Sequence, residues 1–401
     1  MDRMQDEGTR IAAPEAEGVF RYFFRLGFVN IGGPVAQLAM MYDHAVDRAH
    51  WITRERFVRI MGVCHILPGP EALQLAIYVG YLTRGIRGGV FAGVMFVLPG
   101  AVLITILAAL YAAFGALRSV DDALYVLKPA VLGIIAAGLL RIGRAALTSW
   151  TLALIATAAL TGMRLLGVDV ILILFAAGVA ALLVGSAKPE TRPALAVGPL
   201  LWLGSTPALP WLAPVAFTLA EWVDVAWVFL RTGLFSFGGA YGSLALLTRG
   251  VVTEHEWLTS AQLLDGVALS IATPGPFMLF ATWAGYLIAG VPGAAAATVL
   301  VFLPSFVLVL AAAGRIERMR ERPAVRRFLA GVSAGVVAVI LLVTLDLAPA
   351  AFVDPLAGAI ALVAFSLIVI AKRDVALVSV LSMGAGIAHA LLRLALGPAA
   401  Y

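Results

Sequence analysis

The sequence predicts an all-α polytopic membrane protein with two inverted homologous helical-bundle domains, about 12–13 hydrophobic spans, and helices broken at Gly-Gly and Pro-Gly-Pro. Three observations support this fold class. The composition is too apolar for a soluble protein, the chain repeats itself, and equivalent loops of the two repeats differ in charge.

The composition excludes a soluble enzyme. Of the 401 residues, 62% are hydrophobic and 13% are charged, whereas soluble domains have about 45–50% and about 25%. One span needs about 20 apolar residues, so the ceiling is about a dozen spans. The net charge of +5 comes from basic residues that lie mainly between apolar runs, as membrane topology requires. Cys64 is the single cysteine, which excludes an intramolecular disulfide.

The repeat is a displacement of 206 positions that becomes 205 after a one-residue deletion. Residues 25–34 resemble residues 231–240, and the Pro-Gly-Pro motif at 68–70 returns at 274–276. Later matches join Gly80-Tyr81 to Gly285-Tyr286 and Leu98-Pro99 to Leu303-Pro304. So many matched Gly and Pro residues in one register indicate a tandem duplication that joins near residues 187–220.

This repeat predicts the domain boundaries: a charged N-terminal tail 1–19, a first membrane domain 20–190, a Pro-rich linker or extra span 191–221, a second membrane domain 222–393, and a C-terminal tail 394–401. The tail lacks the apolar segment of a signal peptide, so the first apolar run is expected to be retained. Apolar runs fall near 20–41, 57–67, 70–84, 88–113, 124–145, 149–163 and 168–186, and again near 222–248, 262–273, 275–290, 293–314, 325–345, 355–371 and 375–392. The runs beside each Pro-Gly-Pro motif are too short to span the membrane alone. The sequence leaves open whether each pair of runs spans the membrane as one kinked helix or re-enters on the same face as two half-helices.

The charges of equivalent loops predict that the two repeats have opposite orientations in the membrane. Residues 315–327 contain six arginines, whereas the equivalent segment 114–123 has Arg118 against Asp121 and Asp122. Because cytoplasmic loops are rich in Lys and Arg, the two segments are expected on opposite faces. Inverted repeats place a shared site near the bilayer midplane, lined by interrupted helices, and this favours transport over a purely structural bundle.

The interrupted segments predict an anion site. Proline removes a backbone donor, and Pro70 and Pro276 are expected to open the next half-helix, whose free N–H groups carry the positive end of its dipole. Successive N–H groups at Gly32-Gly33 and Gly238-Gly239 can also cup an anion. The structural alternatives are a packed kinked helix and close helix packing.

Polar side chains near these motifs complete the candidate site. Guanidinium groups suit tetrahedral oxyanions, although Arg25 and Arg231 can also snorkel to the interface. The candidate substrate-binding residues are Arg25, Asn30, Gly32, Gly33, Gln37, Pro68, Gly69, Pro70, Gln74, Arg231, Ser236, Gly238, Gly239, Thr273, Pro274, Gly275 and Pro276. Glu71, Asp265 and His65 are candidates for proton coupling. The alternatives are that Glu71 caps a helix, that Asp265 lies at the membrane interface, and that His65 is a structural histidine. No catalytic residue, metal or cofactor is expected, because no ligand spacing, P-loop or nucleophile elbow occurs.

The motifs Gly32-Gly33-Pro34, Leu67-Pro-Gly-Pro-Glu-Ala72, Phe235-Ser-Phe-Gly-Gly-Ala-Tyr241 and Thr273-Pro-Gly-Pro276 resemble the chromate transporter family in its long form with two fused domains. The likeness extends from about Phe20 to Arg393. It implies chromate efflux across the bacterial inner membrane, dependent on the proton motive force and conferring chromate resistance. The expected partners are chromate or a similar small oxyanion and the lipid bilayer, not nucleic acid, and a homodimer is left open.

Membrane energetics favours export. A dianion that leaves an inside-negative cell gains roughly 4.6 kcal/mol per 100 mV, which suits proton antiport or potential-driven uniport. One alternative is a transporter of sulfate or another small anion. An alternative of a different class, an intramembrane enzyme or a structural membrane subunit, predicts a catalytic cluster in one half only, whereas the candidate residues here come mostly in pairs.

Overall fold

The computed structural model describes residues 16–31, 33–64, 67–115, 118–184, 218–237, 240–312 and 323–396, and every regular element in them is helical. The first half contains α1 (Ala16–Val29), α2 (Gly33–Tyr42), η1 (Asp43–Arg48), α3 (Arg54–Cys64), α4 (Glu71–Phe114), α5 (Arg118–Ala146), α6 (Trp150–Leu166) and α7 (Val170–Val184). The second contains α8 (Leu219–Leu234), α9 (Ala240–Thr248), η2 (Arg249–Glu254), α10 (Ser260–Ala272), η3 (Phe277–Leu279), α11 (Phe280–Ala312), α13 (Pro323–Ala351), α14 (Pro355–Val369) and α15 (Val375–Leu396). The candidates Gly32, His65, Gly238 and Gly239 lie outside the described residues.

The duplication extends to individual backbone dihedral angles. Gly69 has a φ of +124° and its equivalent Gly275 a φ of +128°. The long helices α4 and α11 kink at equivalent glycines, Gly85 with a φ of +58° and Gly290 with a φ of +61°. The two six-residue π-helices, η1 and η2, also occupy equivalent positions. The two halves therefore share a backbone path, including its irregular points.

Side-chain caps fix several helix starts. Thr218 with Glu221 and Thr259 with Gln262 form capping boxes at α8 and α10, which satisfy amides that have no partner within the helix. Asp354 caps α14 by accepting a hydrogen bond from the Ala357 amide at 2.7 Å. The Asp354 carboxylate also accepts one from the Tyr125 hydroxyl on α5, at 2.6 Å. These two donors lower the pKa of Asp354, the Tyr125 hydroxyl contributing most.

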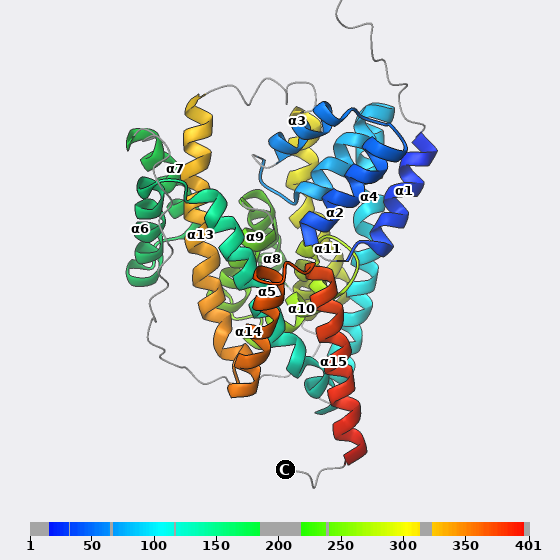
Figure 1. Ribbon diagram of the computed structural model, residues 1–401, viewed down its shortest axis with the longest axis vertical. Helices are drawn as coiled ribbons and strands as arrows, with labels where there is room; N and C mark the ends of the chain where they lie inside the picture. The colour runs from blue at the N-terminus through cyan, green and yellow to red at the C-terminus, as the bar shows by residue number, and fades with distance from the viewer. Residues whose placement is uncertain are drawn as a thin grey trace, which may run out of the picture.

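The two halves exchange helices. In Figure 1, α14 and α15 pack against α5 of the first half, whereas α6 and α7 pack against α13 of the second. The equivalent helices α4 and α11 pack against each other, α1 packs against α4, and its equivalent α8 packs against α11. Each half therefore supplies part of the other half's core.

Equivalent helices run in opposite directions. In Figure 1, α5 begins at the lower end of the molecule and rises, whereas α13 begins at the upper end and descends. In the same view α4 ends at the lower end and α11 at the upper end. This arrangement agrees with the inverted repeat that the loop charges predict.

The helices are those of a multi-pass membrane protein. Among the described residues, five helices are long and apolar enough to span, namely α4, α5, α11 with η3, α13 and α15, and four shorter apolar helices accompany them. Outward-facing leucines on α6 and α7 are strongly exposed, with Leu154 at 68% and Leu183 at 81%, as expected for surfaces that contact lipid. At 13 residues, α10 is about 20 Å long, short of a hydrocarbon core of about 30 Å. A total of about 12–13 spans stays a prediction.

Candidate functional site

The two Pro-Gly-Pro motifs meet between the halves through reciprocal hydrogen bonds. The Gly69 amide donates to the Ser236 carbonyl at 3.2 Å, and the Gly275 amide donates to the Asn30 carbonyl at 3.1 Å. Asn30 and Ser236 are equivalent residues, each just before the glycine pair of its half. We call this meeting point, formed by residues 68–70, residues 274–276, Asn30 and Ser236, the crossing.

Only glycine fits at the centre of each motif. The φ values of Gly69 and Gly275 lie in the region that side chains other than glycine rarely adopt. A Cβ at Gly69 would overlap the Ser305 hydroxyl, and one at Gly275 would lie 3.1 Å from the Gly100 Cα. Gly100 and Ser305 are themselves equivalent residues, so the same close approach of helices occurs on both sides of the crossing.

The half-helices begin after the motifs, as the sequence predicts. Pro70 precedes α4, which starts at Glu71, whereas Pro276 leads first into the 3-10 turn η3 and then into α11. The amides of Ala72 and Leu73 in the first turn of α4 have no acceptor in the described part of the chain. The sequence did not predict that the two motif glycine amides would already be bonded to the opposite half.

Two side chains predicted for the site strengthen the second motif. The Gln37 amide Nε2 donates to Asn30 Oδ1 at 2.8 Å and to the Gly275 carbonyl at 2.9 Å. The Gly275 amide also reaches Asn30 Oδ1 at 3.3 Å. Gln37 and Asn30 are both buried, so these bonds are protected from water. The structure thus joins α2, the end of α1 and the second motif.

The first motif holds Gln74, whose Nε2 donates to the Pro68 carbonyl at 2.8 Å. Three buried polar atoms near the crossing have no hydrogen-bond partner among the described residues: Asn30 Nδ2, Gln74 Oε1 and the Ser305 hydroxyl. Buried polar groups are normally paired, so these atoms mark unused hydrogen-bonding capacity. Ser305 is not among the residues that the sequence predicts for the site, although its equivalence to Gly100 in the register of the repeat is a signal for it.

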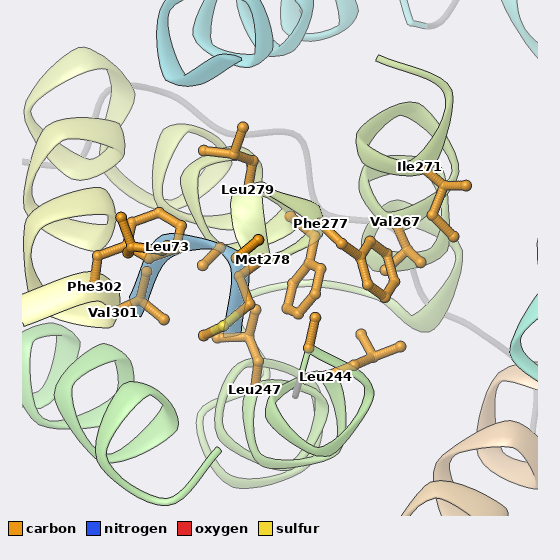
Figure 2. Close-up of a cluster of buried hydrophobic side chains, with 14 of the residues drawn as sticks. Leu73, Leu244, Leu247, Val267, Ile271, Phe277, Met278, Leu279, Val301 and Phe302 are labelled. Carbon is orange, nitrogen blue, oxygen red and sulfur yellow. The ribbon is translucent and has the colours of Figure 1, made fainter. Parts of the chain in front are cut away.

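Apolar side chains close one side of the crossing. Figure 2 shows Phe277, Met278 and Leu279 of η3 packed among Leu73 of α4 and buried residues of α9, α10 and α11. A cavity of about 260 Å³ lies elsewhere, between α6, α7, α9, η2 and α13, and no crossing residue lines it. In this conformation the interrupted helices contact one another between the two halves, at the place where the sequence predicts the shared site.

The remaining candidates have other surroundings. Arg25 is exposed on α1, and Arg231 is paired with Glu254 of η2. The Thr273 hydroxyl, at the C-cap of α10, donates to the carbonyl of Leu269 on that helix at 2.8 Å. The structure therefore brings together Asn30, Gln37, Gln74, Ser236 and the two motifs, but it does not add the two arginines to them.

Asp265 belongs to a buried ionic cluster. Its Oδ1 lies 3.1 Å from Lys128 Nζ on α5, and its Oδ2 accepts a hydrogen bond from the Tyr111 hydroxyl on α4 at 2.9 Å. Neither Lys128 nor Tyr111 is among the residues that the sequence predicts for the site. Lys128 lies within the predicted apolar run 124–145, and a cation inside such a run is itself a signal for a functional residue.

A chain of two homologous helical halves, whose interrupted helices meet between them, has the architecture of a secondary membrane carrier. The comparisons with known proteins then give its family. The chain belongs to the chromate transporter family, because the family model described as Chromate transporter matches residues 18–182 and 223–388. These two matches confirm the duplicated form that the sequence predicts.

Individual relatives are similar along most of their length. The chromate transport protein of Pseudomonas aeruginosa is 36% identical over 339 residues, which cover 82% of this chain and 80% of the relative. The chromate transport protein of Cupriavidus metallidurans is 32% identical, over 88% of this chain and 87% of the relative. A probable chromate transport protein of Synechococcus elongatus is 29% identical over 78% of this chain. No solved structure matches the chain.

Proposed function

We propose that this chain is a carrier, not an enzyme, that exports chromate across the bacterial inner membrane and thereby confers chromate resistance. The membrane potential and the proton gradient supply the energy. The family and the names of the relatives support chromate as the substrate. The observation that carries the proposal is the meeting of interrupted helices from both halves at the crossing.

Chromate is a tetrahedral dianion whose four oxygens accept hydrogen bonds, so its site needs several donors aimed at one point. The buried Asn30 Nδ2 and the Ser305 hydroxyl are donors without partners among the described residues, and they come from different halves. The amides of Ala72 and Leu73 add the positive end of the α4 dipole. An anion between the halves would use donors of both.

Opening of the crossing would release further donors. The amides of Gly69 and Gly275 are held by carbonyls of the opposite half at 3.2 and 3.1 Å. Movement of one half against the other breaks these two bonds together, and the anion then takes the place of the carbonyls. Access from alternate sides follows when the halves rock about the crossing, as in other inverted-repeat carriers.

Uptake of radiolabelled chromate into everted membrane vesicles tests the proposal. A potential that is positive inside such vesicles favours chromate accumulation by about 4.6 kcal/mol per 100 mV. Vesicles that contain the chain are expected to accumulate chromate well above vesicles from a vector control. Equal accumulation, with the protein present in the membrane, would show that the proposal is wrong.

A second candidate substrate is sulfate, because donors from amides and hydroxyls recognise shape and charge, which sulfate shares with chromate. Competition decides between the two anions in the same vesicles. Excess sulfate that leaves chromate uptake unchanged supports a chromate carrier, whereas uptake of labelled sulfate at lower concentrations than chromate identifies a sulfate carrier.

A further inference from the structure

Lys128 lies between two carboxylates that differ greatly in exposure. Its Nζ is 3.1 Å from Asp265 Oδ1 and 3.8 Å from Asp121 Oδ1. The Asp265 side chain is 2% exposed, Lys128 15%, and Asp121 71%. The three charges therefore form a line from the solvent-exposed start of α5 to the interior between α4, α5 and α10.

The surroundings of Asp265 hold few other polar groups. From α4, the Tyr111 hydroxyl donates to Oδ2 at 2.9 Å. From α11, Trp283 packs against the Tyr111 ring, with ring centroids 4.8 Å apart, and its indole N–H donates to the Gln262 carbonyl at 3.0 Å. No charged side chain of α11 takes part in these contacts, so the cluster depends on Lys128 for its positive charge.

The other helices that pack against α10 direct their charges elsewhere. On α15, His389 bonds the Asp122 carbonyl and Arg393 lies 3.6 Å from the Asp122 carboxylate. On α13, Arg326, Arg327 and Asp346 are exposed, and Asp346 is paired with an arginine of α6. The charges close to Asp265 are thus those of Lys128 and, beyond it, Asp121.

A buried ion pair adds little to stability, because desolvation offsets the attraction between its charges. Ionisable residues within a membrane bundle are functional by default. Lys128 can leave Asp265 and keep a counter-ion, since Asp121 is already 3.8 Å away. A buried carboxylate that loses its cation binds a proton, because burial disfavours the charged form.

We propose that Asp265 is the proton-binding site of this carrier, reached from the exposed start of α5 through Asp121 and Lys128. The inference rests on the proposed function and extends it with a route for the proton. A proton from water adds to the Asp265 carboxylate and forms a neutral carboxylic acid, while Lys128 stays an ammonium and moves to Asp121. Deprotonation reverses the exchange.

The proton site is connected to the crossing by packing. Helix α10 carries Asp265 and ends at Ala272, and its C-cap Thr273 directly precedes the second Pro-Gly-Pro motif. A Cβ at Gly266 would overlap the Trp283 ring, so no space separates α10 from the start of α11. A change at Asp265 therefore acts on both helices that flank the second motif.

The proton site has no counterpart in the first half. In the register of the repeat, Asp265 corresponds to Arg59 and Lys128 to Ser333. The repeat therefore does not duplicate this ion pair, which lies on the α10 side of the crossing. This asymmetry makes the two directions of movement different although the backbone is duplicated.

Infrared spectroscopy of the purified protein tests the proton site without any substrate. We expect a protonated-carboxyl band that titrates with pH, is absent in Asp265→Asn, and persists in Asp346→Asn, the control for an exposed ion-paired carboxylate. Lys128→Gln removes the cation, so the midpoint of the band should rise by about one pH unit or more.

A band that survives in Asp265→Asn, or its absence from the wild type, would overturn the inference. If Asp265→Asn does not fold, an unchanged midpoint in Lys128→Gln overturns it equally.

Flux measurements separate this inference from the proposed function. In everted vesicles, chromate uptake is measured under a pH gradient alone and under a potential alone. Asp265→Asn should keep potential-driven uptake within about threefold, a change of less than 1 kcal/mol, and should lose the response to the pH gradient. If the response to the pH gradient persists in Asp265→Asn, the proton site is wrong and chromate transport stands. If wild-type vesicles carry no chromate but the infrared band behaves as expected, the proposed function is wrong and the proton site stands.

Discussion

Gln37→Ala should destabilise the protein more than the matching change in the other half. Gln37 Nε2 makes two buried hydrogen bonds, to Asn30 Oδ1 at 2.8 Å and to the Gly275 carbonyl at 2.9 Å. Its equivalent in the second half is Ser243, whose hydroxyl bonds only the Ala240 carbonyl of its own helix, at 2.8 Å. Both positions are buried, but the Gln37 side chain bonds to the opposite half whereas the Ser243 side chain bonds within its own helix.

The expected magnitude follows from what each truncation leaves behind. In Gln37→Ala the Gly275 carbonyl loses its side-chain donor, at a cost of about 1–3 kcal/mol, and Asn30 Oδ1 loses one of two donors, at about 1 kcal/mol. The sum is about 2–4 kcal/mol. Ser243→Ala removes a local bond that offsets its own desolvation, so we expect a change of about 1 kcal/mol or less.

Reversible unfolding of the purified protein in mixed detergent micelles measures both free energies of unfolding. A change in the free energy of unfolding in Gln37→Ala that is no larger than the change in Ser243→Ala would contradict this prediction. Gln37→Glu is a useful third variant, because it keeps the side-chain length but replaces the donor by a second acceptor. It should be at least as destabilising as alanine.

Three further predictions concern other parts of the molecule. Gly275→Ala, at a φ of +128°, should cost about 1–3 kcal/mol in backbone strain in addition to steric overlap. Gly290 has a φ of +61° and a ψ of −150° with open space around it, so Gly290→Ala should cost the backbone strain alone, about 1–3 kcal/mol, in the same unfolding assay. Gln74→Leu copies Leu279 of the second half, and the loss of its hydrogen-bonding groups should lower vesicle chromate uptake about tenfold, which equals 1.4 kcal/mol, at normal protein abundance. Because the folded-state pKa of Asp354 is lowered, its stabilising contribution is present above the unfolded-state pKa and is lost as the pH falls through the folded-state pKa. Asp354→Ala should therefore lower the unfolding temperature at neutral pH and leave it unchanged in acid.

Local chemistry explains why the crossing could be predicted from the sequence. Proline and glycine restrict or release the backbone wherever they occur, so Pro-Gly-Pro indicates a break without knowledge of its neighbours. The same motif at two equivalent positions then predicts two breaks that face one another. The structure agrees, with Gly69 and Gly275 at nearly identical φ values.

The partners of each group could not be predicted, because they depend on the tertiary arrangement. Lys128 and Asp265 are separated by more than 130 positions in the chain, and no local pattern pairs them. The arginines at 25 and 231 occupy equivalent sequence positions, yet one is exposed and the other is paired with Glu254. Repeated sequence therefore predicts a repeated backbone better than it predicts repeated side-chain contacts.

The exchange of helices between the halves determines when the protein can finish folding. The main packing partners of α5 are α10, α13, α14 and α15, all of which follow it by more than 110 residues. During synthesis α5 therefore lacks its packing partners, and lipid or a membrane insertase covers its inner face until the last helix has been made. A chain truncated before residue 355 lacks α14 and α15, so quality-control proteases should recognise it as unassembled, even though the described helices from α1 to α13 would be complete.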